Sequence, residues 1–505
     1  MVRKFGNVQK NLHANNMKSK HTLMIQGTTS DAGKSVMVAA ICRILANHGV
    51  SVAPFKPQNM ALNSAVTPEG GEIGRAQAVQ AFAAKIEPHT DMNPILLKPS
   101  SDTGAQVILN GKVLGCSSAV DYHQMKPKLL NEVLSAHQRL TDRYKAIIVE
   151  GAGSPAEINL RDRDIANMGF AEAADCPVII VADIDKGGVF AHLVGTYELL
   201  SESEKNRVVG FIINKFRGDF ALLAPGNKWL EEKLGVPVLA TIPFIEQLYI
   251  EPEDALDFNQ ITTGSDVINI TVIVYPRISN HTDFDALRLH PSVNLIYARY
   301  PSEAKASDVI ILPGSKNTID DLGYLLDNNW REHLDKHLRY GGKLIGICGG
   351  MQMLGQSIFD VNNVESSTCK KQGLNYLPLQ TQLTDSKKLT NVSGYISKLG
   401  IEVSGYEIHM GRTKQTDKVK RLITLSNGDE EGYISDDNQI IASYLHGLFD
   451  NEAFLSWFLT WVTGKEVAKL DYQAAREIQF EKLASEVEKH FDVRKILSLL
   501  DINKV

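Results

Sequence analysis

The sequence predicts an α/β protein with two domains, each built around a largely parallel sheet. Its 505 residues are enough for two or more separate hydrophobic cores. Short apolar runs rich in β-branched residues alternate with longer stretches of helical periodicity, as in sheets covered by helices on both faces. A polar stretch with little periodicity, residues 246–266, interrupts this alternation and predicts a linker between the domains.

The composition is that of an ordinary globular protein, with 43% hydrophobic and 22% charged residues. The formal net charge is −6, whereas proteins that bind nucleic acids or anionic membranes usually have an excess of basic residues. We therefore expect neither nucleic acid nor a membrane surface as a partner. No apolar stretch approaches the length of a membrane span, and the first twenty residues lack the apolar segment of a secretory signal. The five cysteines lie far apart without a CxxC pair, which argues against a zinc site or a disulfide framework and favours the reducing cytoplasm.

The N-terminal domain is predicted over residues 21–245, after a solvated tail at residues 1–20. Its expected strands are apolar on both faces, as strands buried between two layers of helices must be. They are residues 22–27, 145–151, 177–183, 208–215 and 237–243. This pattern predicts a doubly wound parallel sheet.

A second α/β domain is predicted over residues 267–505. Its expected strands are residues 268–276, 293–301, 308–315, 343–350 and 440–447. A more strand-rich, mixed stretch lies near residues 374–446. From about residue 451, apolar residues recur at helical spacing, which predicts a helical tail.

The segment after the first strand reads as a glycine-bounded loop followed by an amphipathic helix. The loop ends in Gly33-Lys34-Ser35, and such a loop directs backbone N–H groups and a helix N-terminus at phosphate oxygens. Lys34 would reach the β- and γ-phosphates of a nucleotide, and the Ser35 hydroxyl would bind Mg²⁺. The spacing departs from the usual motif, because Thr28 stands where the first glycine is expected. The flanking strand and helix nevertheless favour a phosphate loop over a chance sequence in a turn.

Two glutamates are candidates to complete a metal site. Glu150 ends an expected strand and is followed by the flexible sequence GAGS. Ligands gather at the carboxyl ends of strands in an open α/β sheet, and a carboxylate there can bind Mg²⁺ directly or through water. The alternative is a solvated glutamate at a strand end. Glu72 is a weaker candidate.

Cys348 lies between an apolar run and two glycines, in a strand, sharp turn and helix pattern. A nucleophile in such a turn is held out of the sheet, with glycines where side chains would clash. The helix N-terminus favours the thiolate, and the N–H of Gly349 can donate to an oxyanion. The alternative is an inert buried thiol, which is common for free cysteine. Two glycines directly after the cysteine argue against that alternative.

A cysteine nucleophile also needs a general base and oxyanion donors from other parts of the chain. His446 follows an apolar strand, the place where a site residue would emerge, and Gly314 at another strand end is a second candidate oxyanion donor. These residues predict a Cys–His acyl-transfer site with a thioester intermediate.

Taken together and in this order, the motifs resemble those of the cobyric acid synthase family, the glutamine-dependent amidotransferases of cobalamin biosynthesis. The resemblance covers nearly everything after residue 21. It is carried by GTTSDAGKS (27–35), FKPQNMALNS (55–64), EIGRAQAVQA (72–81), VEGAGSPAEINLRDRDIANM (149–168), ADIDKGGVFA (182–191), INKFRGD (213–219), LPGSKNT (312–318), GICGGMQMLG (346–355), GYEIHMGR (405–412) and YLHGLF (444–449).

The resemblance implies an N-terminal P-loop domain like that of dethiobiotin synthetase, a branch that tolerates the longer loop. It implies Lys56 at the phosphates of ATP and Asn214 at the adenine. The other implied ATP-binding residues lie in the loop, and they are Thr28, Ser30, Asp31, Gly33, Lys34 and Ser35. The implied Mg²⁺ ligands are Ser35, Glu72 and Glu150.

For the C-terminal domain, the resemblance implies a class I glutamine amidotransferase with Cys348 as nucleophile and His446 as base. Amidotransferases of this class often carry a carboxylate two residues after the histidine, where this chain has Leu448. The partner that orients His446 is therefore open, with Glu407 as one candidate.

The implied reaction is ATP- and glutamine-dependent amidation of adenosylcobyrinic acid a,c-diamide at carboxylates b, d, e and g. The expected small-molecule partners are L-glutamine, ATP and this corrinoid polycarboxylate, and the sequence does not indicate an oligomeric state. Three arginines in loops could bind the corrinoid carboxylates, although ordinary surface ion pairs explain them at least as well; they are Arg161, Arg163 and Arg217.

Three other functions compete with this interpretation. Cobyrinic acid a,c-diamide synthase performs the same chemistry on earlier carboxylates. A partition or septum-positioning ATPase would carry a second lysine early in the loop, where this chain has Thr29. A binding protein with an inactive amidotransferase domain would release no glutamate from glutamine.

Overall fold

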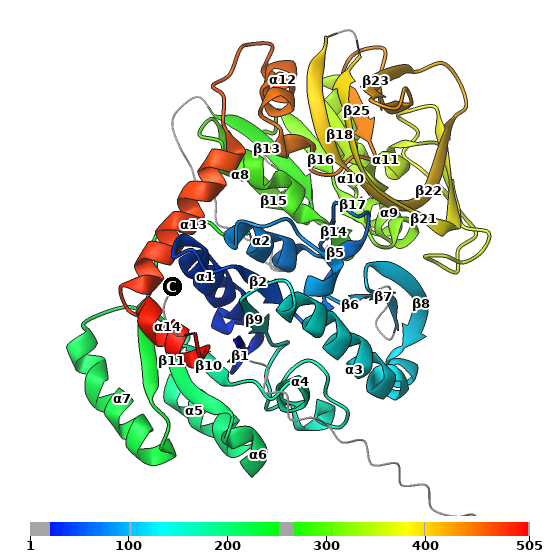
Figure 1. The fold of residues 1–505 in the computed structure, drawn as a ribbon. Helices are drawn as coiled ribbons and strands as arrows, with labels where there is room; N and C mark the ends of the chain where they lie inside the picture. Colours follow the sequence, from blue (N-terminus) through cyan, green and yellow to red (C-terminus); the bar gives the residue numbers. More distant parts are fainter. Residues whose placement is uncertain (1–20, 100–103, 252–266, 305, 398, 503–505) are drawn as a thin grey trace, which may run out of the picture.

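The computed structural model describes residues 21–99, 104–251, 267–304, 306–397 and 399–502. The predicted tail at 1–20 and residues 252–266 of the predicted linker lie outside the described residues. Figure 1 shows two α/β domains, with the N-terminal domain below and the C-terminal domain above. Within the described ranges, none of the helices combines the length and the apolar character needed to span a bilayer.

The N-terminal domain contains a six-stranded sheet in which every pair of neighbours is parallel. This confirms the predicted doubly wound sheet. Each predicted strand of this domain is present, and β2, which was not predicted, adds one edge. In spatial order the strands are β12 (Val238–Pro243), β11 (Val208–Phe216), β10 (Val178–Asp183), β1 (Thr22–Gly27), β9 (Ala146–Glu150) and β2 (Val52–Phe55).

Alternating side chains of the central strand β1 enter two different cores. Leu23 and Ile25 pack with α1 (Lys34–Asn47), whereas Met24 packs with the helices of the opposite face. Those helices are α3 (Ala119–Thr141), α4 (Met168–Ala173), α5 (Val189–Glu198) and α7 (Phe220–Leu234), and the short helix α6 (Glu202–Lys205) precedes β11. Both faces of the sheet are therefore covered, which explains why its strands are apolar throughout.

A set of short strands that the sequence did not predict lies between the two large sheets (Figure 1). Four of them form a sheet in the order β3 (Gln58–Met60), β6 (Ile95–Pro99), β7 (Gly104–Leu109) and β8 (Lys112–Ser118). Two others, β4 (Ser64–Val66) and β5 (Glu72–Gly74), form a hairpin that leads into α2 (Arg75–Ala83).

The C-terminal domain is organised around an 11-stranded mixed sheet. Its first part is parallel and runs β15 (Val293–Ala298), β13 (Ile268–Ile273), β16 (Val309–Leu312), β18 (Lys343–Ile347) and β25 (Ile440–Ser443). It continues through β24 (Glu430–Ile434), β23 (Lys420–Leu425), β21 (Leu379–Ile396), β19 (Ser357–Phe359) and β20 (Lys370–Gln372), with β22 (Ile401–Gln415) antiparallel to β21. The strand-rich stretch predicted near 374–446 corresponds to the second part.

The remaining elements of this domain are short. Strands β14 (Ile278–Ser279) and β17 (Gly314–Ser315) form a separate antiparallel pair. The helices are α8 (Asp285–Leu289), α9 (Thr318–Asp327), α10 (Trp330–Arg339), α11 (Gly349–Leu354) and α12 (Glu452–Thr463).

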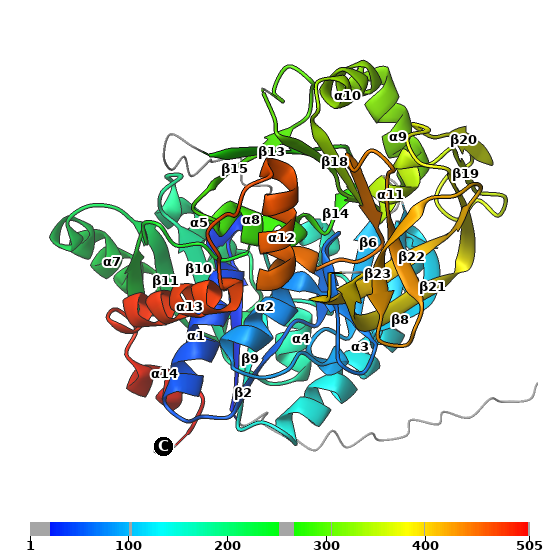
Figure 2. The ribbon, with the colours of Figure 1, turned by 90° about the horizontal axis from the view of Figure 1, so that it is seen from above.

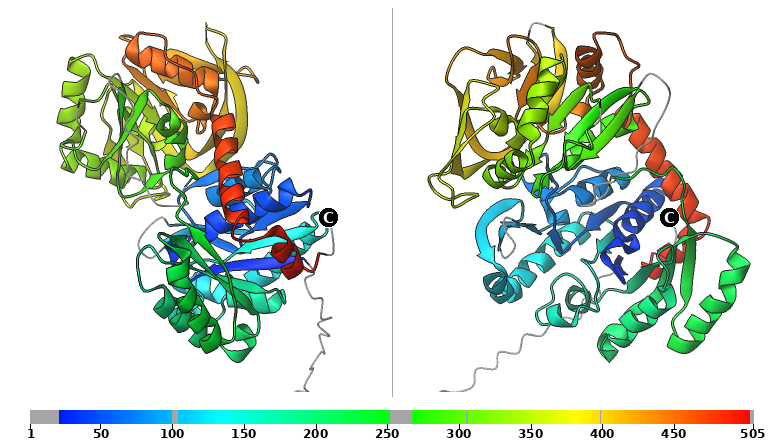
Figure 3. Two further views of the ribbon diagram at one scale, coloured as in Figure 1. Left: turned by 90° about the vertical axis from the view of Figure 1, so that its left-hand side faces the viewer. Right: turned by 180° about the vertical axis from the view of Figure 1, so that it is seen from behind.

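The last two helices leave the C-terminal domain and pack on the N-terminal one. Figures 2 and 3 show α13 (Tyr472–Glu488) lying alongside α1, followed by α14 (Val493–Leu499). Phe480 is buried in the same core as Ile41 of α1, with its ring 5.3 Å from that of Phe82. The buried guanidinium of Arg43 donates to Glu481 at 3.0 Å. The helical tail therefore completes one face of the N-terminal sheet.

Phe480→Ala is expected to destabilise the N-terminal domain, although residue 480 lies near the end of the chain. Removing a phenyl ring that is 2% exposed leaves a cavity, and such a change costs about 3–5 kcal/mol. The free energy of unfolding, measured by denaturant titration, would show this loss. Ile478→Ala is the matched control, since Ile478 is 65% exposed on the same helix and its truncation should cost less than about 0.5 kcal/mol. Equal effects of the two substitutions would contradict this packing.

Candidate active sites

Cys348 lies in the turn between β18 and α11. Its φ of 52° and ψ of −107° form a conformation that costs a residue with a side chain about 1–3 kcal/mol and that clusters at functional sites. A Cβ atom at Gly350 would sit 1.9 Å from the carbonyl oxygen of Leu312, so only glycine allows this close approach. The Cys348 side chain is 7% exposed and lines a cavity together with Gln352. An inert thiol would not need this strained turn facing a cavity.

His446 reaches the same edge of the sheet because β18 and β25 are parallel neighbours. The N–H of Cys348 donates to the carbonyl oxygen of Ser443, the last residue of β25, at 2.8 Å. Nδ1 of His446 lies 2.6 Å from Oδ2 of Asp283, and the N–H of Gly447 donates to Oδ1 of the same carboxylate at 3.1 Å. The structure thus places an acidic residue, a histidine and a cysteine in one buried site, as the Cys–His prediction requires.

Two opposing effects set the protonation of His446. Burial lowers the pKa of the imidazole, but the Asp283 carboxylate and the Cys348 thiol raise it, and the result is a pKa of about 10. The ring of Tyr406 stacks on the imidazole with the centroids 5.4 Å apart, and the backbones of the two residues exchange hydrogen bonds of 3.1 and 2.9 Å. His446 is therefore fixed in orientation and protonated at neutral pH.

The structure identifies Asp283 as the partner of His446, and the suggestion of Glu407 is wrong. The Glu407 carboxylate instead pairs with Lys388 at 2.6 Å and lies 3.4 Å from His409. Asp283 belongs to a short 3-10 turn 163 residues before His446 in the chain. No spacing rule links the two positions, so sequence reasoning missed this residue.

Asp283→Asn is expected to lower the rate of glutamine hydrolysis by about two to four powers of ten, as loss of an orienting carboxylate does in related triads. The lost negative charge would also lower the pKa of His446, so the imidazolium would lose its proton at lower pH. The alkaline limit of the pH–rate profile should move down accordingly. Asp385→Asn, an exposed carboxylate of the same domain, should leave the profile unchanged. An unshifted alkaline limit in Asp283→Asn would contradict this role.

The two predicted oxyanion donors lie beside Cys348 and His446. A Cβ atom at Gly314 would sit 3.3 Å from Cε1 of His446, and one at Gly349 would sit 2.8 Å from the backbone nitrogen of Ser315. A side chain at position 349 would therefore force the backbone to shift, whereas one at position 314 would fit only tightly. Their role as oxyanion donors stays a prediction.

The phosphate loop of the N-terminal domain surrounds its own lysine. Lys34 is buried, and its Nζ donates to the carbonyl oxygens of Thr29 and Ser30 at 2.9 and 3.1 Å. Gly33 has a φ of 97°, the left-handed conformation that favours glycine. The loop is therefore shaped around a cation at the start of helix α1.

Glu150 gathers several groups below this loop. Its carboxylate accepts a hydrogen bond from the Ser35 hydroxyl at 2.7 Å and from Lys56 Nζ at 3.0 Å, and Gln80 donates to its other oxygen. Burial raises the pKa of Glu150, but the combined effect of Lys56 and these hydrogen bonds is larger and lowers it below its usual value. The carboxylate is therefore ionised. The structure thus brings together Ser35, Lys56 and Glu150, and adds Gln80, which sequence reasoning missed.

The other predicted nucleotide residues lie in the loop or contact it. Thr28 is buried, whereas Ser30 and Asp31 are exposed, and Asp31 pairs with Lys186 at 2.9 Å. The amide of Asn214 donates to the carbonyl oxygen of Ala32 in the loop at 3.0 Å. These positions agree with a shared site, and contact of Asn214 with adenine stays a prediction.

Two oxygen donors, the Ser35 hydroxyl and the Glu150 carboxylate, fit Mg²⁺, which prefers such ligands. Within the ranges that the structure describes, no group of three or more His, Cys, Asp or Glu side chains could hold a metal ion. Phosphate and water oxygens would therefore complete the coordination. Glu72 is not brought to this pair: its carboxylate contacts Lys98, Ser64 and Lys387.

The three arginines considered for corrinoid carboxylates all have carboxylate partners within the protein. Arg161 pairs with Glu204, Arg163 lies 3.6 Å from Asp162, and Arg217 lies 2.9 Å from Asp185. Their contact with a substrate stays a prediction.

Comparison with known proteins identifies both domains. Residues 23–258 match a family model described as the CobQ/CobB/MinD/ParA nucleotide binding domain. Residues 269–454 match one described as the CobB/CobQ-like glutamine amidotransferase domain.

Solved structures offer more distant similarities. One described as a glutamine amidotransferase is 16% identical, covering 39% of this chain and 99% of its own, with a TM-score of 0.31. PurLQS from Thermotoga maritima is 14% identical over 44% of this chain and 99% of its own, with a TM-score of 0.28. Chloroplast FtsY from Physcomitrella patens is 16% identical over 44% of this chain and 58% of its own, with a TM-score of 0.26.

Proposed function

We propose that this protein amidates a corrinoid polycarboxylate with nitrogen from glutamine and energy from ATP. The chain joins a CobQ/CobB-type nucleotide-binding domain to a CobB/CobQ-like glutamine amidotransferase domain. This is the architecture of cobyric acid synthase. The proposed acceptor is adenosylcobyrinic acid a,c-diamide, amidated at carboxylates b, d, e and g. We place the reaction in the cytoplasm, in keeping with five free cysteine thiols.

In the glutamine site, the Cys348 thiolate would attack the side-chain amide carbon of glutamine. The His446 imidazolium, held by Asp283, would protonate the departing nitrogen, so that ammonia leaves and a thioester remains. Neutral His446 would then take a proton from water, whose oxygen attacks the thioester. Glutamate leaves, and the thiolate and the imidazolium are restored.

In the nucleotide site, an acceptor carboxylate would attack the γ-phosphorus of ATP to give an acyl phosphate and ADP. Lys34, Lys56 and the loop N–H groups would offset the charge that develops on the phosphate oxygens. Mg²⁺, when bound, would supply further positive charge at the same oxygens. Ammonia would then attack the acyl carbon, forming the amide and expelling phosphate, which is a far better leaving group than the oxide of an unactivated carboxylate.

A single observation carries the proposal: one chain holds the Cys348–His446–Asp283 site and a phosphate loop whose Ser35 contacts a buried strand-end glutamate. The nucleotide-binding model is shared with MinD and ParA proteins, so nucleotide binding alone does not distinguish them. The amidotransferase domain favours nitrogen transfer over a nucleotide-switched ATPase.

The test measures glutamate and ADP from Mg-ATP and L-glutamine, with and without the a,c-diamide, and the mass of the corrinoid product. We expect ADP formation, and glutamate release above a slow basal rate, only with the corrinoid, and a product that has gained four amides. A parallel assay with cobyrinic acid as the acceptor distinguishes this activity from that of cobyrinic acid a,c-diamide synthase. A preference for cobyrinic acid over the a,c-diamide would identify the protein as the latter enzyme. The absence of glutamate release under every condition would overturn the proposal.

A further inference from the structure

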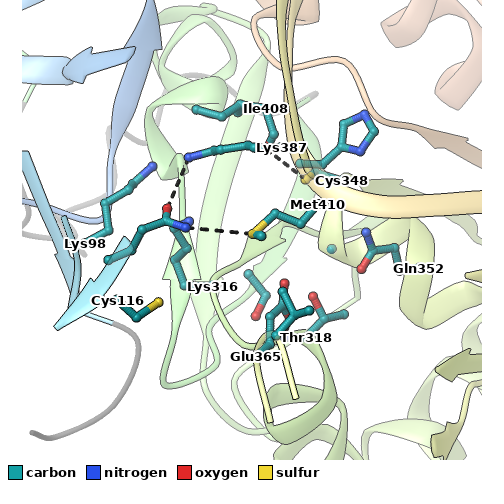
Figure 4. Close-up of a pocket in the computed structure, with 15 residues that line it drawn as sticks. Lys98, Cys116, Lys316, Thr318, Cys348, Gln352, Glu365, Lys387, Ile408 and Met410 are labelled. Carbon is teal, nitrogen blue, oxygen red and sulfur yellow. Dashed lines mark hydrogen bonds between the residues drawn. The ribbon is translucent and has the colours of Figure 1, made fainter. Parts of the chain in front are cut away.

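The cavity beside Cys348 is shared by the two domains (Figure 4). Most of its lining belongs to the C-terminal domain, including Lys316, Gln352 and Glu365, but one wall comes from the N-terminal domain. That wall consists of Lys98 from β6, Gln106 from β7 and Cys116 from β8. Nitrogen released at Cys348 would therefore face the amide-forming domain directly.

Three lysines surround this cavity, namely Lys98, Lys316 and Lys387. Burial and the neighbouring lysines lower the pKa of Lys98 and lower that of Lys316 to about 8, so this lining already disfavours cations. The released nitrogen would therefore stay as neutral ammonia and not as ammonium. Only the neutral form has the lone pair that attacks an acyl phosphate. The lining thus suits ammonia in transit better than a stored cation.

Lys98 and Lys387 approach each other from different domains and meet at one carboxylate, that of Glu72 (Figure 4 shows the two lysines). Lys98 Nζ lies 2.6 Å from Oε1 of Glu72, and Lys387 pairs with Oε2. The three side chains are at most 8% exposed. Burial raises the pKa of Glu72, but the two lysines lower it well below its usual range, so the buried carboxylate is ionised.

The position of Lys387 depends on an irregularity of strand β21. The pairing of β21 with β22 shifts register between Leu383 and Lys388, so Lys387 lies in a bulge. Bulges redirect side chains and often lie next to active sites. Lys387 also donates to Oε1 of Gln106 at 3.4 Å, across the domain boundary. Because of the bulge, the Lys387 side chain extends from the amidotransferase domain to the wall of the cavity that the N-terminal domain forms.

Glu72 is tied to the nucleotide site by one short helix. It begins β5, which leads directly into α2, and Gln80 of α2 donates to Glu150 beneath the phosphate loop. A helix of this length spans about 14 Å. A change in the partners of Glu150 on nucleotide binding would thus reach Glu72 through a rigid element.

We propose that Glu72, Lys98 and Lys387 form the ammonia gate between the two sites, with Lys387 as the residue that seals the glutamine cavity until the nucleotide site moves α2. This inference rests on the proposed function. The paired form seen here is the closed gate. Lys387 is a positioning residue, because it does not touch the reacting atoms. It couples glutamine hydrolysis to the nucleotide site, so that ammonia is released only when an activated acceptor is ready.

Lys387→Met tests the gate, with the glutamate released per ADP formed as the readout. We expect this ratio to rise by about fivefold or more, because a broken coupling lets glutamine hydrolysis run without amidation. ADP formation with ammonium chloride in place of glutamine should stay at the wild-type rate. Glu72 keeps Lys98 as a partner in this variant, so the buried carboxylate stays paired.

Lys388→Met is the matched control, since the neighbouring lysine is 51% exposed and pairs with Glu407. Lys388→Met and the conservative Lys387→Arg should both keep the wild-type ratio. A wild-type ratio in Lys387→Met would overturn the gate. Failure of the proposed function would look different, because the wild-type protein itself would then release no glutamate or form no ADP with ammonia.

Discussion

Cys348→Ala is expected to lower glutamine-dependent amidation by about a thousandfold or more, because alanine cannot form the thioester. The phosphate loop and Glu150 lie in the other domain and are untouched. The variant should therefore still form ADP and amide when ammonia is supplied at high concentration. Glutamate release and ADP formation, measured with each nitrogen source, would separate the two half-reactions.

The matched control for this substitution is Cys369→Ala. Cys369 is an exposed thiol of the same domain, so its removal should leave both nitrogen sources usable. Retention of normal glutamine turnover by Cys348→Ala would show that another group is the nucleophile. Loss of both glutamine- and ammonia-dependent turnover would indicate that the strained turn at residue 348 also holds the two domains in a working arrangement.

The large sheets were predictable because burial imposes a simple pattern on them. Strands such as β1 and β10 are covered on both faces, so they read as continuous apolar runs. The strands that build the wall between the domains do not. β8, for example, has no buried residue, and β3 and β4 have three residues each. Segments so short or so exposed carry no periodicity that distinguishes them from loops.

The same contrast applies to the sites. Cys348 and Lys34 were predictable because local geometry demands glycine beside them, and glycine is visible in the sequence. Asp283 and Lys387 act through tertiary contacts that join segments far apart in the chain. Only the folded chain shows that Glu72 meets two lysines and not the phosphate loop. A single sequence contains no signal for such pairings.

Ammonia release in the glutamine domain and activation of the acceptor carboxylate in the nucleotide domain should respond to different substitutions. Substitution of Lys34 in the phosphate loop is therefore the counterpart of Cys348→Ala. The control for a substitution of Lys34 is Lys228→Ala. Lys228 is 77% exposed on α7 of the same domain, so its replacement should change neither ADP formation nor glutamine hydrolysis.

Lys34→Ala is expected to lower ADP formation by about a hundredfold or more with either nitrogen source, because the charge developing on the transferred phosphoryl group loses a preorganised cation. Lys34 is 4% exposed and is held by two loop carbonyl oxygens, so its charge is already positioned before a nucleotide binds. The Cys348 site does not include Lys34, so basal glutamine hydrolysis should persist. Addition of nucleotide and corrinoid should no longer stimulate it, because α2 would not respond to a productive nucleotide complex. ADP formation at the wild-type rate would place the phosphoryl-transfer site away from this loop.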